Sequence, residues 1–165
     1  SRSLGWPVRA RSTPSSRTRG AEVALELGAD AAIDPGEAPV AEQLRQRTGI
    51  GPDVVVDASG SPPATLSAIE AVRSGGRVVI VALPIKAVSI NFLSVVSTEK
   101  EIIGSLSHVY DEDYLAAIRL LGDGRVQADP LISDRIPLSD LLSRGFHRLE
   151  AQPADTLKIL VKPGR

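Results

Sequence analysis

The sequence predicts an α/β fold built on a doubly wound parallel sheet, and two stretches lead to this prediction. Residues 53–62 and 75–84 each contain an unbroken apolar run that stops at small residues, Gly or Pro. Unbroken runs of Val and Ile, rather than alternating ones, are typical of strands buried on both faces of a parallel sheet. Between them, residues 63–74 have apolar side chains at helical spacing. Together they predict a strand–helix–strand unit with a right-handed crossover.

The other expected elements are delimited by Gly, Pro and capping residues. The expected helices are 21–27 (ending at Gly28), 40–48, 92–98 (a short helix or turn), 111–121 and 139–149. The expected strands are 31–34, 87–91, 101–106, 132–136 and 157–161. The last two strands, with the helix between them, form a C-terminal strand–helix–strand tail.

The composition excludes several classes of protein. The chain has 165 residues, of which 42% are hydrophobic and 3% aromatic, so a core of aliphatic side chains can form. Its net charge of −1 gives no reason to expect a nucleic-acid or membrane partner. It has no apolar run of membrane-spanning length and no signal-peptide pattern, and we expect a cytoplasmic location. The absence of Cys excludes disulfides and thiolate zinc sites within the chain.

Residues 1–20 differ from the rest of the chain, because they contain five Arg and no acidic residue. Their many Ser, Thr, Pro and Gly residues indicate a disordered or loosely attached segment. A basic arm that binds nucleic acid is an alternative, although Trp6 is the only aromatic residue there. A third interpretation is that the residues before about Ala21 are not native sequence, since GC-rich DNA read in the wrong frame yields such Arg- and Ser-rich stretches.

The ends of the two apolar strands are candidate ligand-binding positions. Ligands of open parallel sheets bind beyond the carboxyl ends of the strands. Those ends fall at residues 58–60 and 82–84, where small side chains would let a flat ligand lie against the backbone. Ordinary strand-to-helix turns have the same composition, and the residues alone leave both interpretations open.

Further motifs accompany these strands. Gly28-Ala29-Asp30 precedes an expected strand, Ile102-Ile103-Gly104-Ser105-Leu106 follows Asn91-Phe92, and residues 129–138 read DPLISDRIPL. In this order and spacing, from about Ala21 to the C-terminus, the chain resembles the zinc-type medium-chain dehydrogenases. Residues 129–138 are similar to the butanediol and sorbitol dehydrogenase branch of that family.

The resemblance implies a Rossmann-like sheet that is incomplete. Residues 31–34, 53–57, 77–83 and 101–106 would be strands 3 to 6, whereas strands 1 and 2 and the Gly-rich phosphate turn would lie upstream. We therefore expect a C-terminal fragment in three parts. These parts are the basic segment 1–20, a partial dinucleotide-binding domain 21–107, and a segment 108–165 that returns to the catalytic domain.

The resemblance also implies the nicotinamide half of an NAD(P) site at nine positions. The nicotinamide ribose would lie along Ala58, Ser59 and Gly60, the carboxamide would meet backbone groups of Val81, Ala82 and Leu83, and Ser105, Leu106 and Ser107 would close over the ring. Ser107 stands where many relatives carry Arg, and Ala82 stands where many carry Gly.

The family oxidises secondary alcohols to ketones with NAD(P) and a zinc ion held by Cys, His and Glu of an N-terminal domain. We expect no metal ligand or catalytic residue here, because Cys is absent and His108 and His147 are far apart in the sequence. The chain alone should therefore be inactive. Alternatives are a zinc-free quinone or enoyl reductase of the same superfamily and a non-catalytic pairing module. The expected partners are a small alcohol or ketone and a second copy, since in the family the edge strand from Val88 to Asn91 joins two subunits.

Overall fold

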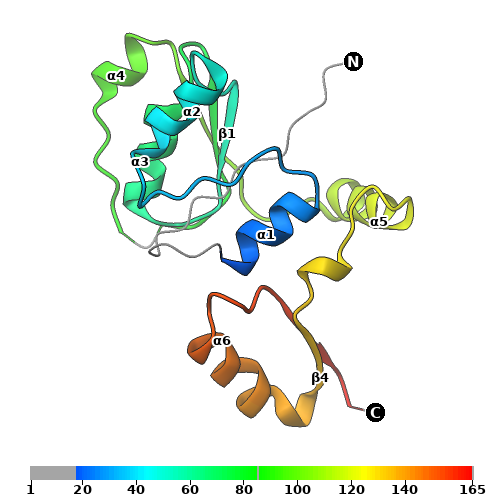
Figure 1. The fold of residues 1–165 in the computed structure, drawn as a ribbon. Coiled ribbons are helices and arrows are strands. Elements are labelled where there is room, and N and C mark those ends of the chain that lie inside the picture. Colours follow the sequence, from blue (N-terminus) through cyan, green and yellow to red (C-terminus); the bar gives the residue numbers. More distant parts are fainter. Residues whose placement is uncertain (1–17, 85, 165) are drawn as a thin grey trace. The chain divides into compact units, whose positions relative to one another are not determined.

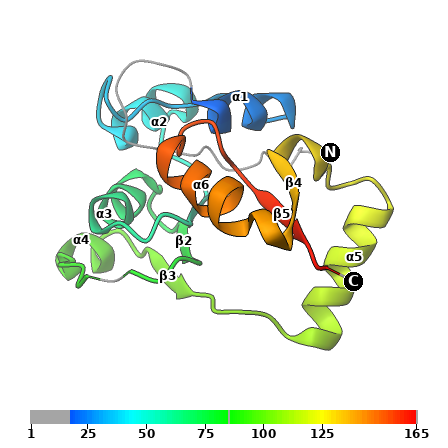
Figure 2. The ribbon, with the colours of Figure 1, turned by 90° about the horizontal axis from the view of Figure 1, so that it is seen from below.

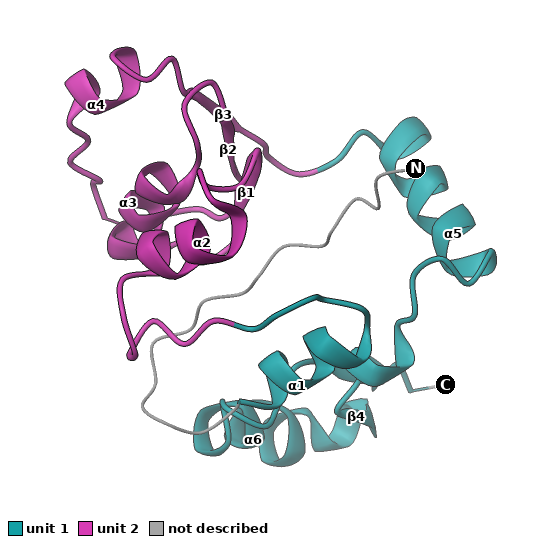
Figure 3. Ribbon diagram, turned by 45° about the horizontal axis from the view of Figure 1, so that its top comes forward, with its two compact units in different colours: residues 1–9, 16–32, 108–165 teal, residues 10–15, 33–107 magenta. Residues whose placement is uncertain are grey.

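The computed structural model describes residues 18–84 and 86–164. They form two compact units, which Figure 3 shows in different colours. One unit contains residues 33–84 and 86–107, and the other contains residues 18–32 and 108–164. Most of the basic segment 1–20 lies outside the described residues. No helix in the described part of the chain is long and apolar enough to cross a membrane.

The 33–107 unit is built on three parallel strands in the order β1-β2-β3; β1 is labelled in Figure 1 and all three strands in Figure 3. The strands are β1 (Val54–Asp57), β2 (Arg77–Ile80) and β3 (Glu101–Gly104). Val55 of β1 is paired with Val78 of β2, which is paired with Ile102 of β3. Val78 of the central strand is completely buried, but Val54 and Val56 of β1 are 52% and 39% exposed and Ile103 of β3 is 38% exposed. The expected burial of these strands on both faces is therefore wrong for β1 and β3. The predicted α/β fold with a parallel sheet is nevertheless confirmed.

Helices α2 (Val40–Thr48) and α3 (Pro62–Ala71) lie side by side, and α3 is the crossover between β1 and β2. Two prolines occupy the first two positions of α3, where their missing N–H groups are not needed. Ala68, Ile69 and Val72, in and just after α3, form the core together with Val78 and Val95. Val95 comes from the short helix α4 (Phe92–Val96), whose N-cap is Asn91.

Residues 31–34, predicted to be a strand, have no strand structure. Among the described residues no strand pairs with them, and an isolated strand leaves its backbone polar groups unsatisfied. The buried amide of Gln43 stabilises this loop instead, because its Nε2 donates to the carbonyl oxygens of Asp34 and Ala38, each at 2.8 Å. The prediction of a strand here was therefore wrong.

Residues 87–91, also predicted to be a strand, likewise form no ladder with any described strand. Ile90 still packs against the core of the 33–107 unit. The Asn91 side chain accepts a hydrogen bond from Leu93 N at 3.1 Å and so begins α4. The alternating Val88 and Ile90 follow strand periodicity, but the segment needs a hydrogen-bonded neighbour to become a strand.

The second unit begins with α1 (Arg19–Glu26), whose N-cap Thr18 accepts from Ala21 N. Gly28 follows the helix at φ +97°, and Ala29 N donates to Ala24 O at 2.9 Å. This is a Schellman ending, which requires a left-handed residue at the position of Gly28. The predicted helix end at Gly28 is confirmed.

The rest of this unit contains short helical segments and a second parallel ladder. Its helices are a π-helical turn (Tyr110–Tyr114) continuing into α5 (Leu115–Gly122), and a π-helical segment (Leu141–Phe146) continuing into α6 (His147–Ala151). Two 3-10 turns span Asp129–Leu131 and Leu138–Asp140. Strands β4 (Asp134–Pro137) and β5 (Ile159–Lys162) pair in parallel, with Ile136 opposite Val161 (Figure 2). The predicted strand–helix–strand tail is confirmed.

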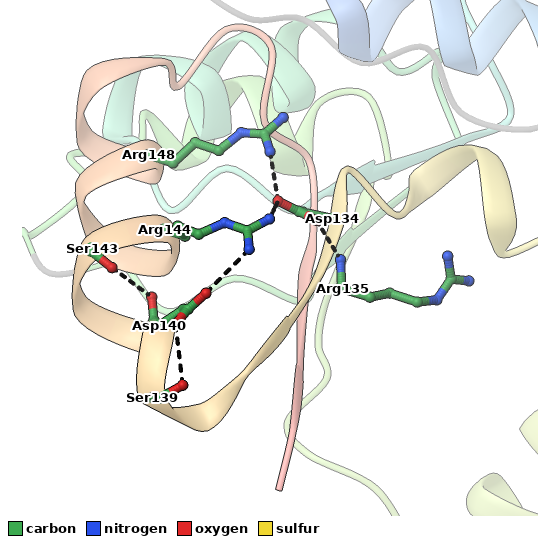
Figure 4. Close-up of polar contacts among 7 residues, drawn as sticks. All are labelled: Asp134, Arg135, Ser139, Asp140, Ser143, Arg144 and Arg148. Carbon is green, nitrogen blue, oxygen red and sulfur yellow. Dashed lines mark hydrogen bonds and ion pairs between the residues drawn. The ribbon is translucent and has the colours of Figure 1, made fainter. Parts of the chain in front are cut away.

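A carboxylate joins β4 to the helical segment that follows it (Figure 4). One Asp134 oxygen, Oδ2, accepts from Arg148 Nη1 at 2.9 Å and from Arg144 Nη2 at 3.2 Å. Arg144 also donates to Asp140 at 3.1 Å. The two guanidinium groups lie four residues apart on a helical face, so a carboxylate between them offsets their repulsion.

Candidate functional site

The carboxyl ends of the three parallel strands bring the predicted site segments together. Val81 N and Ala82 N, just after β2, donate to the carbonyl oxygen of Asp57 at 3.0 and 3.3 Å. Ser105 N, just after β3, donates to Ile80 O at 2.9 Å. The segments 58–60, 81–83 and 105–107 therefore leave adjacent strands at one edge of the sheet, where open parallel sheets bind ligands.

Gly60 shows how closely two of these segments approach. Its φ of +68° is in the left-handed region, and a Cβ at this position would lie 3.3 Å from Leu83 O. A side chain here would press against the 82–83 backbone, so glycine fits both the turn and the contact. The small residues Ala58 and Ser59 precede it and are exposed. The turn therefore presents small side chains at the end of β1.

The nine positions differ in how they face the solvent. The exposed positions are Ala58, Ser59, Val81, Leu83, Ser105, Leu106 and Ser107. Gly60 and Ala82 are partly buried. Leu83 and Leu106 are 72% and 75% exposed, which leaves apolar surface beside the strand ends. The N–H groups of Val81 and Ala82 are used by Asp57, so a ligand carboxamide would have to use the carbonyl groups or Leu83 N.

The side chain of Asp57, the last residue of β1, is only 5% exposed and accepts three hydrogen bonds. Its Oδ1 accepts from Ser59 N at 2.9 Å and from Ser59 Oγ at 2.6 Å, and its Oδ2 accepts from Thr65 Oγ1 at 2.6 Å. Burial by itself raises the pKa of Asp57, but the hydrogen bonds from Ser59 and Thr65 more than offset it and leave the pKa below its ordinary value. The buried carboxylate is therefore ionised at neutral pH.

Asp57 and Thr65 were not among the residues selected from the sequence. A signal was present, because Asp followed two residues later by Ser at a strand end is the pattern of a side-chain turn. Thr65 carried no local signal, since its link to Asp57 depends on how α3 packs on β1. Buried polar residues of this kind are found from the folded structure and not from periodicity.

No described residues form a candidate metal centre, because no group of three or more His, Asp or Glu side chains comes together in the part of the chain that the structure describes. His108 and His147 are both exposed. His147 lines an open groove of about 510 Å³ with Asp134, Ser143, Arg144, Arg148, Ala151 and Gln152. The arginines of this groove are paired with carboxylates, so it offers a ligand little uncompensated charge.

Parallel strands with helical crossovers, and a flat, small-residue platform at their carboxyl ends, define a class of nucleotide-binding α/β proteins. Comparison with known proteins gives the family. Residues 13–123 match the model of the family described as zinc-binding dehydrogenase. The chain belongs to this family, as the motifs in its sequence predicted.

Individual relatives support the same assignment. The chain is 32% identical over 136 residues to "(R,R)-butanediol dehydrogenase" of Neisseria gonorrhoeae, covering 82% of this chain and 38% of that protein. It is 30% identical over 142 residues to "Sorbitol dehydrogenase" of Halalkalibacterium halodurans, covering 85% and 40%. The crystal structure of 2R,3R-butanediol dehydrogenase from Bacillus subtilis matches with a TM-score of 0.81 and 29% identity, over 94% of this chain and 43% of that one. The chain thus spans about two fifths of the length of the relatives it matches.

Proposed function

We propose that this chain holds the nicotinamide half of an NAD(P) cofactor, as part of a dehydrogenase that interconverts a secondary alcohol or polyol and its ketone. The observation that carries the proposal is that the segments 58–60, 81–83 and 105–107 lie together at one edge of the sheet. Backbone hydrogen bonds to the carbonyl oxygens of Asp57 and Ile80 hold them there. The similarity to butanediol and sorbitol dehydrogenases supports the substrate class. A bound nicotinamide cofactor supplies the hydride acceptor or donor for this conversion.

The role of the protein at this site is to orient the ring and keep water away from one face. The small, exposed residues Ala58 and Ser59 would allow the ribose to approach the backbone of this turn closely. Leu83 and Leu106 carry the exposed apolar side chains that can cover the ring, and their burial by a ligand would be favourable at about 25 cal/mol per Å². None of the nine residues has an acid–base group, so the proton of the alcohol must be removed by other residues or by solvent.

The test is a titration of the 165-residue chain with reduced nicotinamide mononucleotide, followed by amide chemical shifts. We expect shifts at Ala58, Ser59 and Gly60 and in the 81–83 and 105–107 segments. Adenosine monophosphate, which lacks the nicotinamide, is the control ligand and should leave them unchanged. Shifts confined to the groove around Arg144, or no shifts at all, would contradict the proposal.

A second assay tests the expectation that the chain alone does no chemistry. The described residues offer no group of zinc ligands, so no step of the reaction is assigned to zinc in this chain. We expect no oxidation of (R,R)-butanediol by the purified chain with NAD and added zinc. Robust turnover under these conditions would show that the residues needed for the chemistry lie within these 165 positions.

The proposed partner is a second copy that pairs through the segment from Val88 to Asn91. Val88 and Ile90 are partly buried, and the segment has no ladder partner among the described strands. A strand of a second copy would satisfy its backbone groups. Sedimentation with and without cofactor tests this. A dimer that a Ser89→Pro substitution abolishes supports pairing through this segment, and a dimer that the substitution leaves intact argues against it. A dimer that the cofactor does not affect would favour the non-catalytic pairing module.

A further inference from the structure

We propose that Asp57 is a positioning residue that holds two of the three cofactor-binding segments in register, although it does not itself contact the cofactor. The inference rests on the proposed function. It adds a residue that would affect nicotinamide binding by holding Ser59, Val81 and Ala82 in place. It is drawn from the hydrogen bonds around this side chain and from its burial.

Asp57 is bound to both segments at once, through different groups. Its carboxylate accepts from the N–H and the hydroxyl of Ser59, which fixes the turn 58–60. Its carbonyl oxygen accepts from Val81 N and Ala82 N, which fixes the start of 81–83. A displacement of Asp57 would therefore move the segments 58–60 and 81–83 together.

The carboxylate is itself anchored from behind by α3. Thr65 is 2% exposed, and its Oγ1 lies 2.6 Å from Asp57 Oδ2 and 3.2 Å from Ser61 O. Ser59 Oγ in turn accepts from Ser61 N at 3.1 Å. The chain of bonds from α3 through Asp57 to Ser59 restrains the turn at successive residues, and hydrogen bonds to an ionised group are among the stronger ones in proteins.

Asp57 is the one acidic residue that is buried in the described part of the chain. Among the ion pairs formed within residues 18–84 and 86–164, none includes Asp57. A buried charge without a cation is costly unless hydrogen bonds satisfy it, and here they come from the turn that lines the site. If this carboxylate served stability alone, a lysine or arginine placed anywhere around it could neutralise its charge equally well. The placement of its donors in the turn 58–61 and in α3 points to a role in shaping the turn.

The test uses the 165-residue chain with four substitutions and two measurements. Asp57→Ala removes the anchor, and Thr65→Val removes one bond from a residue that lies behind the site. Asp57→Asn keeps the shape, since its oxygen can accept from Ser59 while its amide donates to Thr65 Oγ1. Asp53→Ala is the matched control, because Asp53 precedes the same strand at its opposite end and pairs with Arg73. The measurements are the affinity for reduced nicotinamide mononucleotide and the hydrogen exchange of the Ser59 and Val81 amides without ligand.

We expect Asp57→Ala to weaken binding about tenfold or more, the factor that corresponds to one lost hydrogen bond to a charged group. Thr65→Val should weaken it less, Asp57→Asn should restore most of it, and Asp53→Ala should leave it unchanged. In Asp57→Ala the Ser59 and Val81 amides should exchange faster even without ligand.

Two results separate this inference from the proposed function. If the unsubstituted chain does not bind reduced nicotinamide mononucleotide, the proposed function fails, and the role of Asp57 at the site fails with it. The other result is that the unsubstituted chain binds, and that Asp57→Ala and Thr65→Val bind reduced nicotinamide mononucleotide with the same affinity and show the same Val81 exchange, even if both variants are less stable to heat. In that case only the positioning role of Asp57 is overturned.

Discussion

The buried carboxylate of Asp57 makes the stability of the 33–107 unit depend on acid pH. Its pKa is lower in the folded chain than the ordinary value of 3.8, because hydrogen bonds from Ser59 and Thr65 outweigh the effect of burial. The carboxylate therefore contributes stability that is fully present above pH 3.8 and is lost as the pH falls below this value toward the folded pKa. Urea denaturation from neutral to acid pH should show this loss, and Asp57→Asn should reduce its slope. An identical slope in the variant would contradict it.

Gly76 is a residue of this unit where an added methyl group should be costly. A Cβ there would lie 2.6 Å from Val72 Cγ2, 2.9 Å from Arg73 O and 3.0 Å from Asp53 O. Two of these atoms are backbone atoms, so Gly76→Ala should reduce the free energy of unfolding by about 1–3 kcal/mol. Gly104→Ala, in β3, is the control because nothing lies within 4 Å of its Cβ position. Chemical denaturation should show a loss only for Gly76→Ala, and equal effects would contradict the packing argument.

Single residues also show how far the sequence predicts the site. Small residues after an apolar run mark the end of a strand, and they indicated 58–60 and 82–84. The segment 105–107 and the nine individual positions came from the resemblance. The sequence does not show that a side chain at position 60 would press on Leu83 O. Nor does it show that Val81 N and Ala82 N donate to the carbonyl oxygen of Asp57. Such contacts depend on strand register and helix packing, which join residues 20 or more positions apart. Sequence patterns describe neighbours along the chain, and these residues are neighbours in space.

At the scale of elements, strands were predicted well only where a partner strand exists. β1, β2 and β3 form one ladder, and β4 and β5 form another, close to the positions that their apolar runs predict. Residues 31–34 and 87–91 have strand-like composition but no described neighbour, and they remain loops. Residues 139–149 were predicted as one helix, but the structure has a succession of 3-10, π and α segments over 138–151. A helix makes its backbone hydrogen bonds within one segment, whereas a strand requires a second segment to pair with.

The outer edge of β1 should make the isolated chain associate. β1 is paired only with β2 in the described residues, and its Val54 is 52% exposed. β4 and β5, by contrast, carry Arg135 and Lys162, charges of the kind that protect sheet edges. Val54→Lys should therefore lower the concentration-dependent association measured by sedimentation. Leu142→Lys, at a leucine 70% exposed in the other unit, is the control. Equal association of both variants and the unsubstituted chain would contradict this role for the edge.

At the scale of the whole molecule, each unit has buried apolar side chains of its own, which predicts two separable unfolding steps. Ile136, 1% exposed, belongs to the unit of residues 18–32 and 108–164, and Val78 is the buried centre of the other. Ile136→Ala should destabilise its own unit by about 2–5 kcal/mol, and Val78→Ala should destabilise the 33–107 unit by less, because fewer carbon atoms are removed.

Hydrogen exchange resolved by residue can assign each loss to a unit. Ile136→Ala should speed hydrogen exchange in β4 and β5 and leave the exchange of β1 and β2 unchanged. Val78→Ala should speed exchange in β1 and β2 and leave that of β4 and β5 unchanged. Val78→Ala, and not Ile136→Ala, should lower the affinity for reduced nicotinamide mononucleotide, since all nine proposed contact residues belong to the 33–107 unit. A common loss of protection in both units after either substitution would mean that the chain unfolds as one body, so that a change in the C-terminal tail would also alter the cofactor platform.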